Sequence, residues 1–137
     1  MALIPKIFKF KKYFKGKIKT VKKNIKIQFG NFALKANEAG RLTPKQIEST
    51  RKTMKKILKP FNGLIRRKIT AKLPVTSKPI AVRMGRGKGK VAMPVVPVKK
   101  GTILFEIYCL NKEVAVKAAQ QASFKLPIST VFIKTFK

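Results

Sequence analysis

The sequence contains no histidine and no aspartate, and its one cysteine is Cys109. Catalytic triads built on histidine, aspartate dyads and histidine-rich metal sites are therefore excluded. Cys109 lies in an apolar run, residues 107–110, and without a histidine partner it is more simply a buried structural thiol than a nucleophile. A lone cysteine also forms no intrachain disulfide. The composition therefore predicts a protein that is not an enzyme and needs no metal or other cofactor.

Acidic residues are scarce as well. Four glutamates stand against 34 lysines and arginines, which gives a formal net charge of +30 over 137 residues. The glutamates are scattered along the chain, at Glu38, Glu48, Glu106 and Glu113. A compact domain with this charge repels itself unless a polyanion neutralises it. Because the basic residues occur along nearly the whole chain, we expect nucleic acid as the partner, with an anionic membrane surface as the alternative.

The most distinctive stretch is residues 79–90. Residues 80–84 are predicted to form a short strand that runs into a loop. In this loop three glycines alternate with three cations: Gly85, Arg86, Gly87, Lys88, Gly89 and Lys90. Glycine allows positive φ and close backbone approach, and the interleaved cations suit an anionic surface such as a run of phosphates. A solvated basic turn is the alternative interpretation.

Two nucleotide-pocket motifs do not fit this loop. In a phosphate-binding P-loop that starts at Gly85, the second glycine would fall on Lys90, and no serine or threonine follows. The dinucleotide fingerprint also requires its third glycine at that position. Pro94 and Pro97 then forbid the helix that either motif needs. The loop is therefore not predicted to bind a free nucleotide.

The N-terminal residues 5–23 alternate lysines with aromatic side chains. This pattern predicts an extension that is disordered in the free protein and becomes ordered on RNA, by phosphate pairing and base stacking. Insertion as a helix into a membrane surface is the third option. The lysines expected to contact RNA here are Lys9, Lys11, Lys12, Lys15 and Lys17.

Residues 43–59 give the clearest helix signal. Thr43 is the expected N-cap, Pro44 stands at the first helical position, and Gln46 completes a capping box. One face carries a narrow apolar stripe, and the opposite face is basic: Lys45, Arg51, Lys52, Lys55, Lys56 and Lys59. Since only Glu48 can pair with these cations, an anionic partner is favoured over a merely solvated surface.

The other segments read mainly as strands. Residues 25–29 and 32–36 alternate and are separated by Gly30 and Asn31, which predicts a hairpin. Further strands are expected at residues 64–73, 91–98, 102–110 and 131–136, with a turn at 75–78 and a helix at 112–126 capped by Asn111. Pro94 and Pro97 confine strand 91–98 to an edge or to bulges. The prediction is an α+β fold, in which residues 1–24 form the extension and residues 25–137 form one domain with two helices on a mixed sheet.

Several blocks resemble the bacterial and organellar family of large-subunit ribosomal protein sixteen. Residues 74–79 (PVTSKP) and 82–89 (VRMGRGKG) match its P-[IV]-T-x-K-P-x-x-V-R-M-G-x-G-K-G. Residues 29–36 resemble F-G-x-F-x-L-K-A, residues 40–51 resemble G-R-L-T-x-x-Q-I-E-x-x-R, and residues 125–132 resemble K-L-P-I-x-T-x-F. These blocks stand in the family order, and as an ordered set they are highly specific.

The resemblance implies an α+β fold with a projecting hammerhead-like loop, seated on large-subunit rRNA near the peptidyl-transferase centre. There the family helps to shape the aminoacyl-tRNA site beside neighbouring ribosomal proteins. The residues that carry over are Arg83, Met84, Gly85, Gly87, Lys88, Gly89, Arg41, Gln46 and Arg51. Lys35 and Lys78 lie within the matching blocks and, with Lys45, Arg86 and Lys90, complete the expected RNA-binding set. We expect Arg83 and Lys88 to contact rRNA or tRNA phosphate.

The chain departs from the family after the loop. Residues 91–94 (VAMP) replace an acidic residue and an aromatic one, so the strand path there does not transfer. The N-terminal residues 11–17 (KKYFKGK) resemble the family's K-F-R-K-x-x-K-G-R only in kind, and their contacts do not transfer either.

The compartment is predicted from composition. Lysine, isoleucine and phenylalanine are abundant and tryptophan is absent, as in the product of an AT-rich gene. The N-terminus shows neither a long apolar signal core nor the character of a transit peptide, and no apolar run approaches the ~18 residues that span a bilayer. We therefore expect an organelle-encoded protein of the mitochondrial ribosome, with the bacterial cytoplasm or a plastid as the alternative.

Overall fold

A computed structural model describes residues 8, 10, 12–18, 26–85 and 87–135. The elements in chain order are β1 (Phe32–Ala36), β2 (Gly40–Leu42), α1 (Pro44–Leu58), the 3-10 turn η1 (Lys59–Phe61), β3 (Leu64–Arg67), β4 (Leu73–Ser77), β5 (Lys90–Val98), β6 (Ile103–Tyr108), α2 (Lys112–Ser123) and β7 (Thr130–Lys134). The α+β class with two helices is confirmed. The strands, however, form two sheets with antiparallel pairing, where one mixed sheet was expected.

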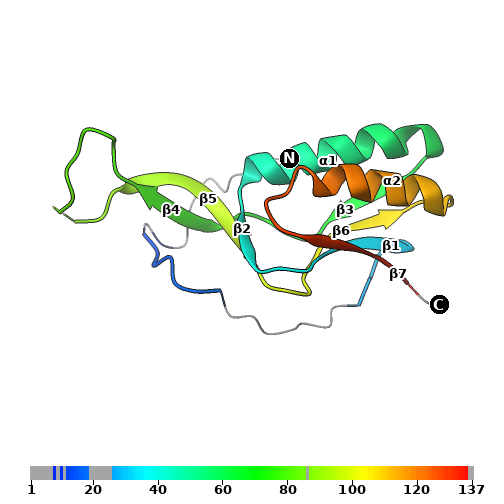
Figure 1. Ribbon diagram of the computed structural model, residues 1–137, viewed down its shortest axis with the longest axis horizontal. Helices are drawn as coiled ribbons and strands as arrows, with labels where there is room; N and C mark the ends of the chain where they lie inside the picture. Colours follow the sequence, from blue (N-terminus) through cyan, green and yellow to red (C-terminus); the bar gives the residue numbers. More distant parts are fainter. Residues whose placement is uncertain (1–7, 9, 11, 19–25, 86, 136–137) are drawn as a thin grey trace.

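The main core lies between the two helices and the four-stranded sheet, whose order is β3-β6-β1-β7. Figure 1 shows α1 and α2 side by side over this sheet. Phe32, Leu34 and Phe105 are buried on the strands. Against them α2 presents a face of small side chains, as predicted: Val114, Ala115, Ala118, Ala119 and Ala122. Small side chains allow the helix to approach the neighbouring layer closely.

Both helices begin where the sequence predicted. Thr43 Oγ1 accepts a hydrogen bond from Gln46 N at 3.3 Å, and Gln46 Oε1 accepts one from Thr43 N at 2.9 Å, which is the expected capping box. Asn111 caps α2 by accepting from Glu113 N at 2.9 Å. The helix ends at Ser123, earlier than predicted, because the next backbone bonds are shorter-range turns from Lys125 N to Ala122 O and from residue 126 to residue 123.

The hairpin predicted from residues 25–36 is wrong for the residues that the structure describes. Gly30 does adopt a positive φ of 77°, but residues 26–31 form no strand. β1 is already paired with β6 on one side and β7 on the other, so no free edge is left for residues 25–29. The segment crosses close to β6 instead, and a Cβ on Gly30 would lie 2.3 Å from Ile107 O. Ile25 lies outside the described residues.

The second sheet has the order β2-β5-β4. Its long strand β5 contains Pro94 and Pro97, yet it is the middle strand of the three. The two halves of β5 pair on opposite sides: residues 96–98 with β2, and residues 90–95 with β4. Each half is therefore paired on one side only, as an edge strand is. Proline, which has no N–H to donate, is tolerated on the unpaired side of such a strand. The edge strand expected from the prolines is therefore not found for β5 as a whole, although each half has one unpaired edge.

Three other predictions near the loop are wrong. The turn expected at residues 75–78 is largely strand, because β4 is an outer strand that tolerates Pro74 opposite Pro94. The strand expected at residues 64–73 stops at Arg67 and resumes only as β4. The strand expected at residues 80–84 is absent from this described stretch, which is exposed and begins with a turn from Val82 N to Pro79 O at 3.2 Å. None of the described strands pairs with it.

The two sheets give the molecule its elongated shape. β4 and β5 extend away from the helical layer, and residues 78–89, which we call the central loop, form the tip of this projection (Figure 1). A projecting loop was the expectation drawn from the family resemblance. The boundary expected after residue 24 falls among residues 19–25, outside the described part of the chain, and it stays a prediction.

Candidate nucleic-acid interface

The glycines of the central loop serve two different purposes. Gly85 and Gly87 have φ values of 106° and 81°, and a Cβ on either would meet nothing within 4 Å. Their role is conformational, since side-chain-bearing residues rarely adopt these angles. Gly89 differs, because its Cβ would lie 2.4 Å from Ser77 O. The close approach at Gly89 is made to the protein's own β4, and the predicted approach of the loop to an anionic surface stays a prediction.

The cations of the central loop fall into two groups. Arg83 in the central loop and Lys90, the first residue of β5 next to it, are exposed, and neither side chain has a hydrogen-bond or ion-pair partner among the described residues. Met84 beside them is 94% exposed. Lys78 instead donates to the carbonyl of Gly85 and braces the loop from within. Arg86 lies outside the described residues.

Residues 12–18, which we call the basic arm, lie against the central loop and the second sheet. Lys88 Nζ donates to Tyr13 O at 2.6 Å and lies 4.8 Å from the centre of the Phe14 ring. Lys12 Nζ donates back to Lys88 O at 2.9 Å. Arg41 Nη2, from β2, donates to Gly16 O at 2.6 Å and to the carbonyl of residue 15. Two predicted RNA-binding cations, Lys88 and Arg41, therefore hold the arm.

The remaining arm lysines stay open to solvent. The side chains of Lys15 and Lys17 are exposed, with no hydrogen-bond partner in the described part of the chain. Lys9 and Lys11 lie outside the described residues. The arm thus adds free cations beside those of the central loop, and the structure brings these two predicted regions together.

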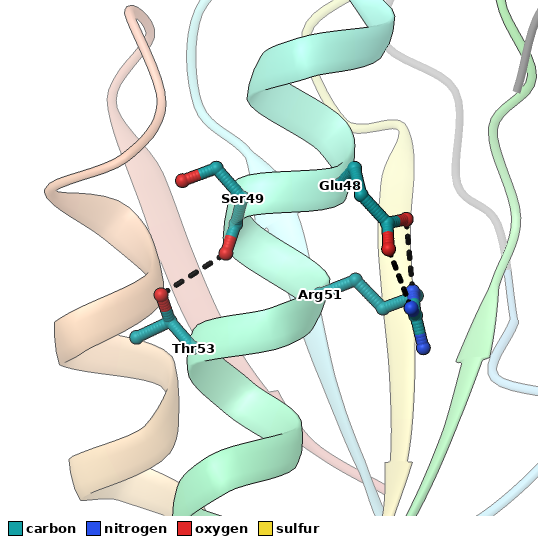
Figure 2. A network of polar contacts seen from close by, with 4 residues as sticks. All are labelled: Glu48, Ser49, Arg51 and Thr53. Atoms are coloured by element: carbon teal, nitrogen blue, oxygen red, sulfur yellow. Dashed lines mark hydrogen bonds and ion pairs between the residues drawn. The ribbon is translucent and has the colours of Figure 1, made fainter.

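Helix α1 holds the third predicted region. Arg51 Nε donates to Glu48 Oε2 at 2.9 Å and Arg51 Nη2 to Glu48 Oε1 at 2.5 Å, as Figure 2 shows. This bidentate pair lowers the pKa of the Glu48 carboxyl below its ordinary value of 4.5, although partial burial opposes the shift. It raises the pKa of the Arg51 guanidinium. Part of the donor capacity of Arg51 is therefore already used within the helix.

The other predicted residues on this side take varied positions. Lys45 is exposed at the start of α1, whereas the side chain of Gln46 is committed to the capping box. Lys35 is half-buried on β1. They do not join the basic arm and central loop in a single cluster.

The projecting strands β4 and β5 and the central loop carry no carboxylate. No acidic residue occurs between Glu48 and Glu106, a stretch that includes β4, the central loop and β5. Glu106 is fully buried on β6, where its Oε1 accepts from Gln28 N at 2.9 Å and lies 3.6 Å from Lys68 Nζ. With Glu48 paired to Arg51, the projecting part of the molecule presents uncompensated positive charge.

Sequence reasoning missed two features. The first is the Gln28–Glu106–Lys68 network, for which the one signal was a glutamate inside a run of buried strand residues. The second is Lys99, which follows β5 and lies beside the basic arm. The sequence feature that could have indicated Lys99 was the turn at residues 99–101, which returns the chain towards the first sheet.

Comparison with known proteins supplies the family. The model of the family described as ribosomal protein L16p/L10e matches residues 5–133. A relative from Buchnera aphidicola subsp. Cinara cedri (strain Cc), named large ribosomal subunit protein uL16, is 44% identical over 131 residues, which cover 96% of each chain. The chain belongs to the ribosomal protein L16p/L10e family.

Membership in the L16p/L10e family confirms the resemblance found in the sequence. It supports a structural role in the large ribosomal subunit and gives no reason to expect catalysis. Among the described residues, no group of three or more His, Cys, Asp or Glu side chains could hold a metal ion. None of the described helices is both long and apolar enough to cross a membrane.

Proposed function

We propose that the chain binds large-subunit rRNA near the peptidyl-transferase centre and helps to form the aminoacyl-tRNA site. Family membership supports the assignment to the large subunit. The observation that carries the rRNA-binding part is the projection of β4, β5 and the central loop, which lacks carboxylates and lies against a basic arm. RNA phosphates supply the negative charge that such a surface needs.

Within this surface, exposed Arg83 of the central loop and exposed Lys90 at the start of β5 are the direct phosphate contacts that we propose. Lys15 and Lys17 play the same role in the basic arm. Gly85 and Gly87 set the path of the loop through their positive φ values. The proposed aminoacyl-tRNA contact belongs to the tip of the central loop, because the tip reaches farthest from the helical layer (Figure 1).

Sedimentation tests the ribosomal part of this proposal. A lysate is separated on sucrose gradients at low and at high salt, and the chain is detected by mass spectrometry. We expect it to travel with the large subunit and to remain there at moderate salt. Crosslinking at Arg83 then tests which RNA the loop contacts. Migration as a free small protein, or with membranes, would contradict ribosomal assembly.

The compartment remains a proposal. The relative that is 44% identical is bacterial, and this supports the cytoplasm of a bacterium more than the predicted mitochondrion. A lysine-rich composition reflects the base content of a gene and not the compartment that translates it. Fractionation of source cells, followed by detection of this chain on cytoplasmic or organellar large subunits, separates the two.

A further inference from the structure

A groove of about 460 Å³ lies between the basic arm and the second sheet. Its sheet side is lined by Leu73 and Val75 of β4 and by Val95 and Pro97 of β5. Residues two apart on a strand point to the same face, so these four side chains form one apolar surface. A volume of this size is typical of sites that hold a small organic molecule.

Aromatic side chains of the basic arm line the opposite side of the groove. Tyr13 and Phe14 both contribute, and Phe14 is 86% exposed. The ammonium of Lys88 lies 4.8 Å from the centre of the Phe14 ring and helps to hold it in place. Because most of the ring surface is free, Phe14 offers a stacking platform for a planar group.

The cations of the groove define the charge of its occupant. Arg41 and Lys88 are bound to arm carbonyls, while the ammonium groups of Lys15, Lys17 and Lys99 have no partner among the described residues. Among the described residues, no acidic side chain lines the groove. An apolar floor, an aromatic wall and a ring of free cations suit a planar, apolar-faced group that carries phosphates on its edge.

We propose that this groove takes one unpaired, unstacked nucleotide of RNA. Its base lies between Phe14 and the apolar face of the second sheet, and its flanking phosphates pair with Lys15, Lys17 and Lys99. A paired nucleotide is excluded because its base is stacked inside the A-form helix, whereas an unpaired one can be splayed out onto an aromatic ring. The inference rests on the proposed rRNA binding and adds the kind of RNA feature that is recognised.

Two matched RNA hairpins, one with a bulge and one without, test the inference. The full-length protein is titrated into a hairpin that carries a single bulged 2-aminopurine, and into the same hairpin without the bulge. We expect the bulged RNA to bind about 5- to 150-fold more tightly, the range that corresponds to stacking one base on an aromatic side chain. The fluorescence of the bulged base should change on binding.

Pairs of matched variants test whether the preference for the bulged RNA comes from the groove. Phe14→Ala should remove the preference for the bulge, whereas Phe124→Ala, a change at another exposed phenylalanine (77%) outside the groove, should keep it. Lys99→Gln should weaken binding of the bulged RNA more than Lys100→Gln, although both remove one charge from the same turn. Circular dichroism confirms that each variant is folded.

Two outcomes separate the inference from the proposed function. If the protein binds both hairpins with equal affinity, or if Phe14→Ala and Phe124→Ala behave alike, the nucleotide groove is refuted while rRNA binding stands. If the protein binds neither hairpin and does not travel with the large subunit, the proposed function fails as well.

Discussion

Single cations in this protein differ in what they already bind. Arg83 is exposed and unpaired within the described residues, Lys88 holds the basic arm, and Arg51 is paired to Glu48. Residues that look equivalent in the sequence therefore have unequal capacity for an external phosphate. The sequence predicted these cations as RNA contacts, but it could not reveal which donors are used by the chain's own carbonyls and carboxylates.

Reversing the charge of Arg83 and Lys88 together tests the central loop. The double variant Arg83→Glu, Lys88→Glu should impair subunit assembly or translation without abolishing the fold, because both residues lie outside the core. Gradient sedimentation and circular dichroism measure the two properties. Lys112→Glu with Lys117→Glu makes the same charge change on exposed positions of α2 and is the control. Normal assembly and translation by the loop variant would show that the loop is not the working element.

A substitution of Glu106 tests a second single residue, the centre of the buried polar network. Its buried carboxylate connects residues 26–31 to the sheet through Gln28 N and Lys68. Glu106→Ala should lower the free energy of unfolding by about 1–3 kcal/mol, since a buried donor loses its acceptor. Glu106→Gln keeps an acceptor oxygen and should lose less. Urea denaturation measures both, and an alanine variant as stable as the parent would contradict a stabilising role for the network.

Helix α1 is the element that the sequence predicted best, because its cap is local. Thr43 and Gln46 are three residues apart, so their hydrogen bonds form without help from distant residues. Strands depend on partners elsewhere in the chain. The hairpin at Gly30 failed for that reason: its second half was already paired on both sides.

Two threonine variants separate capping from other hydrogen bonding on α1. Thr43→Ala should cost about 1 kcal/mol of stability, because the amide of Gln46 loses its acceptor. Thr53 Oγ1 donates to Ser49 O at 3.0 Å within the helix, as Figure 2 shows. Thr53→Ala should change stability much less, since alanine has the better helix propensity. Equal losses of stability in thermal unfolding would argue against the cap as the stabilising feature.

The ion pair on α1 predicts a pH dependence. The pKa of Glu48 is lowered in the folded protein, so its contribution is fully present above about pH 4.5 and is lost as the pH falls through the folded value. At neutral pH, Glu48→Gln should cost only about 0.3–0.5 kcal/mol, as is usual for such pairs on helix surfaces. The difference from the parent should vanish in acid. Glu38→Gln, at an exposed position, is the control, and it should show no such loss with pH.

At the scale of the molecule, the charge of +30 should make RNA affinity steeply dependent on salt. Each phosphate contact contributes roughly 0.7–0.9 to the slope of log affinity against log salt. Arg83→Gln should reduce the magnitude of this slope by about that amount, and Arg51→Gln by less, because Arg51 is neutralised by Glu48. Filter binding over a salt series measures the slopes, and equal reductions would mean that the pair opens on RNA.

The class of the fold and the family could be predicted from the sequence, and the location of the RNA interface stays a prediction. Composition, glycine spacing and helix-capping signals depend on the residue types and on residues close together in the sequence. They can therefore be recognised without knowledge of the tertiary structure. The division into two sheets could not be predicted, because it depends on β5 changing partner between residues 95 and 96. The groove could not be predicted either, since it requires the basic arm to lie across residues 73–97.

The changed pairing of β5 has a mechanical consequence. Its nine residues form a stiff beam of roughly 30 Å, held by β4 towards the tip and by β2 at its base. Leu42, paired with Val96, ends β2, and only Thr43 separates it from α1. A force applied to the central loop therefore reaches the helical layer through paired backbone, without a slack linker on the way. Through β5, β2 and Thr43 the central loop is connected to the first turn of α1.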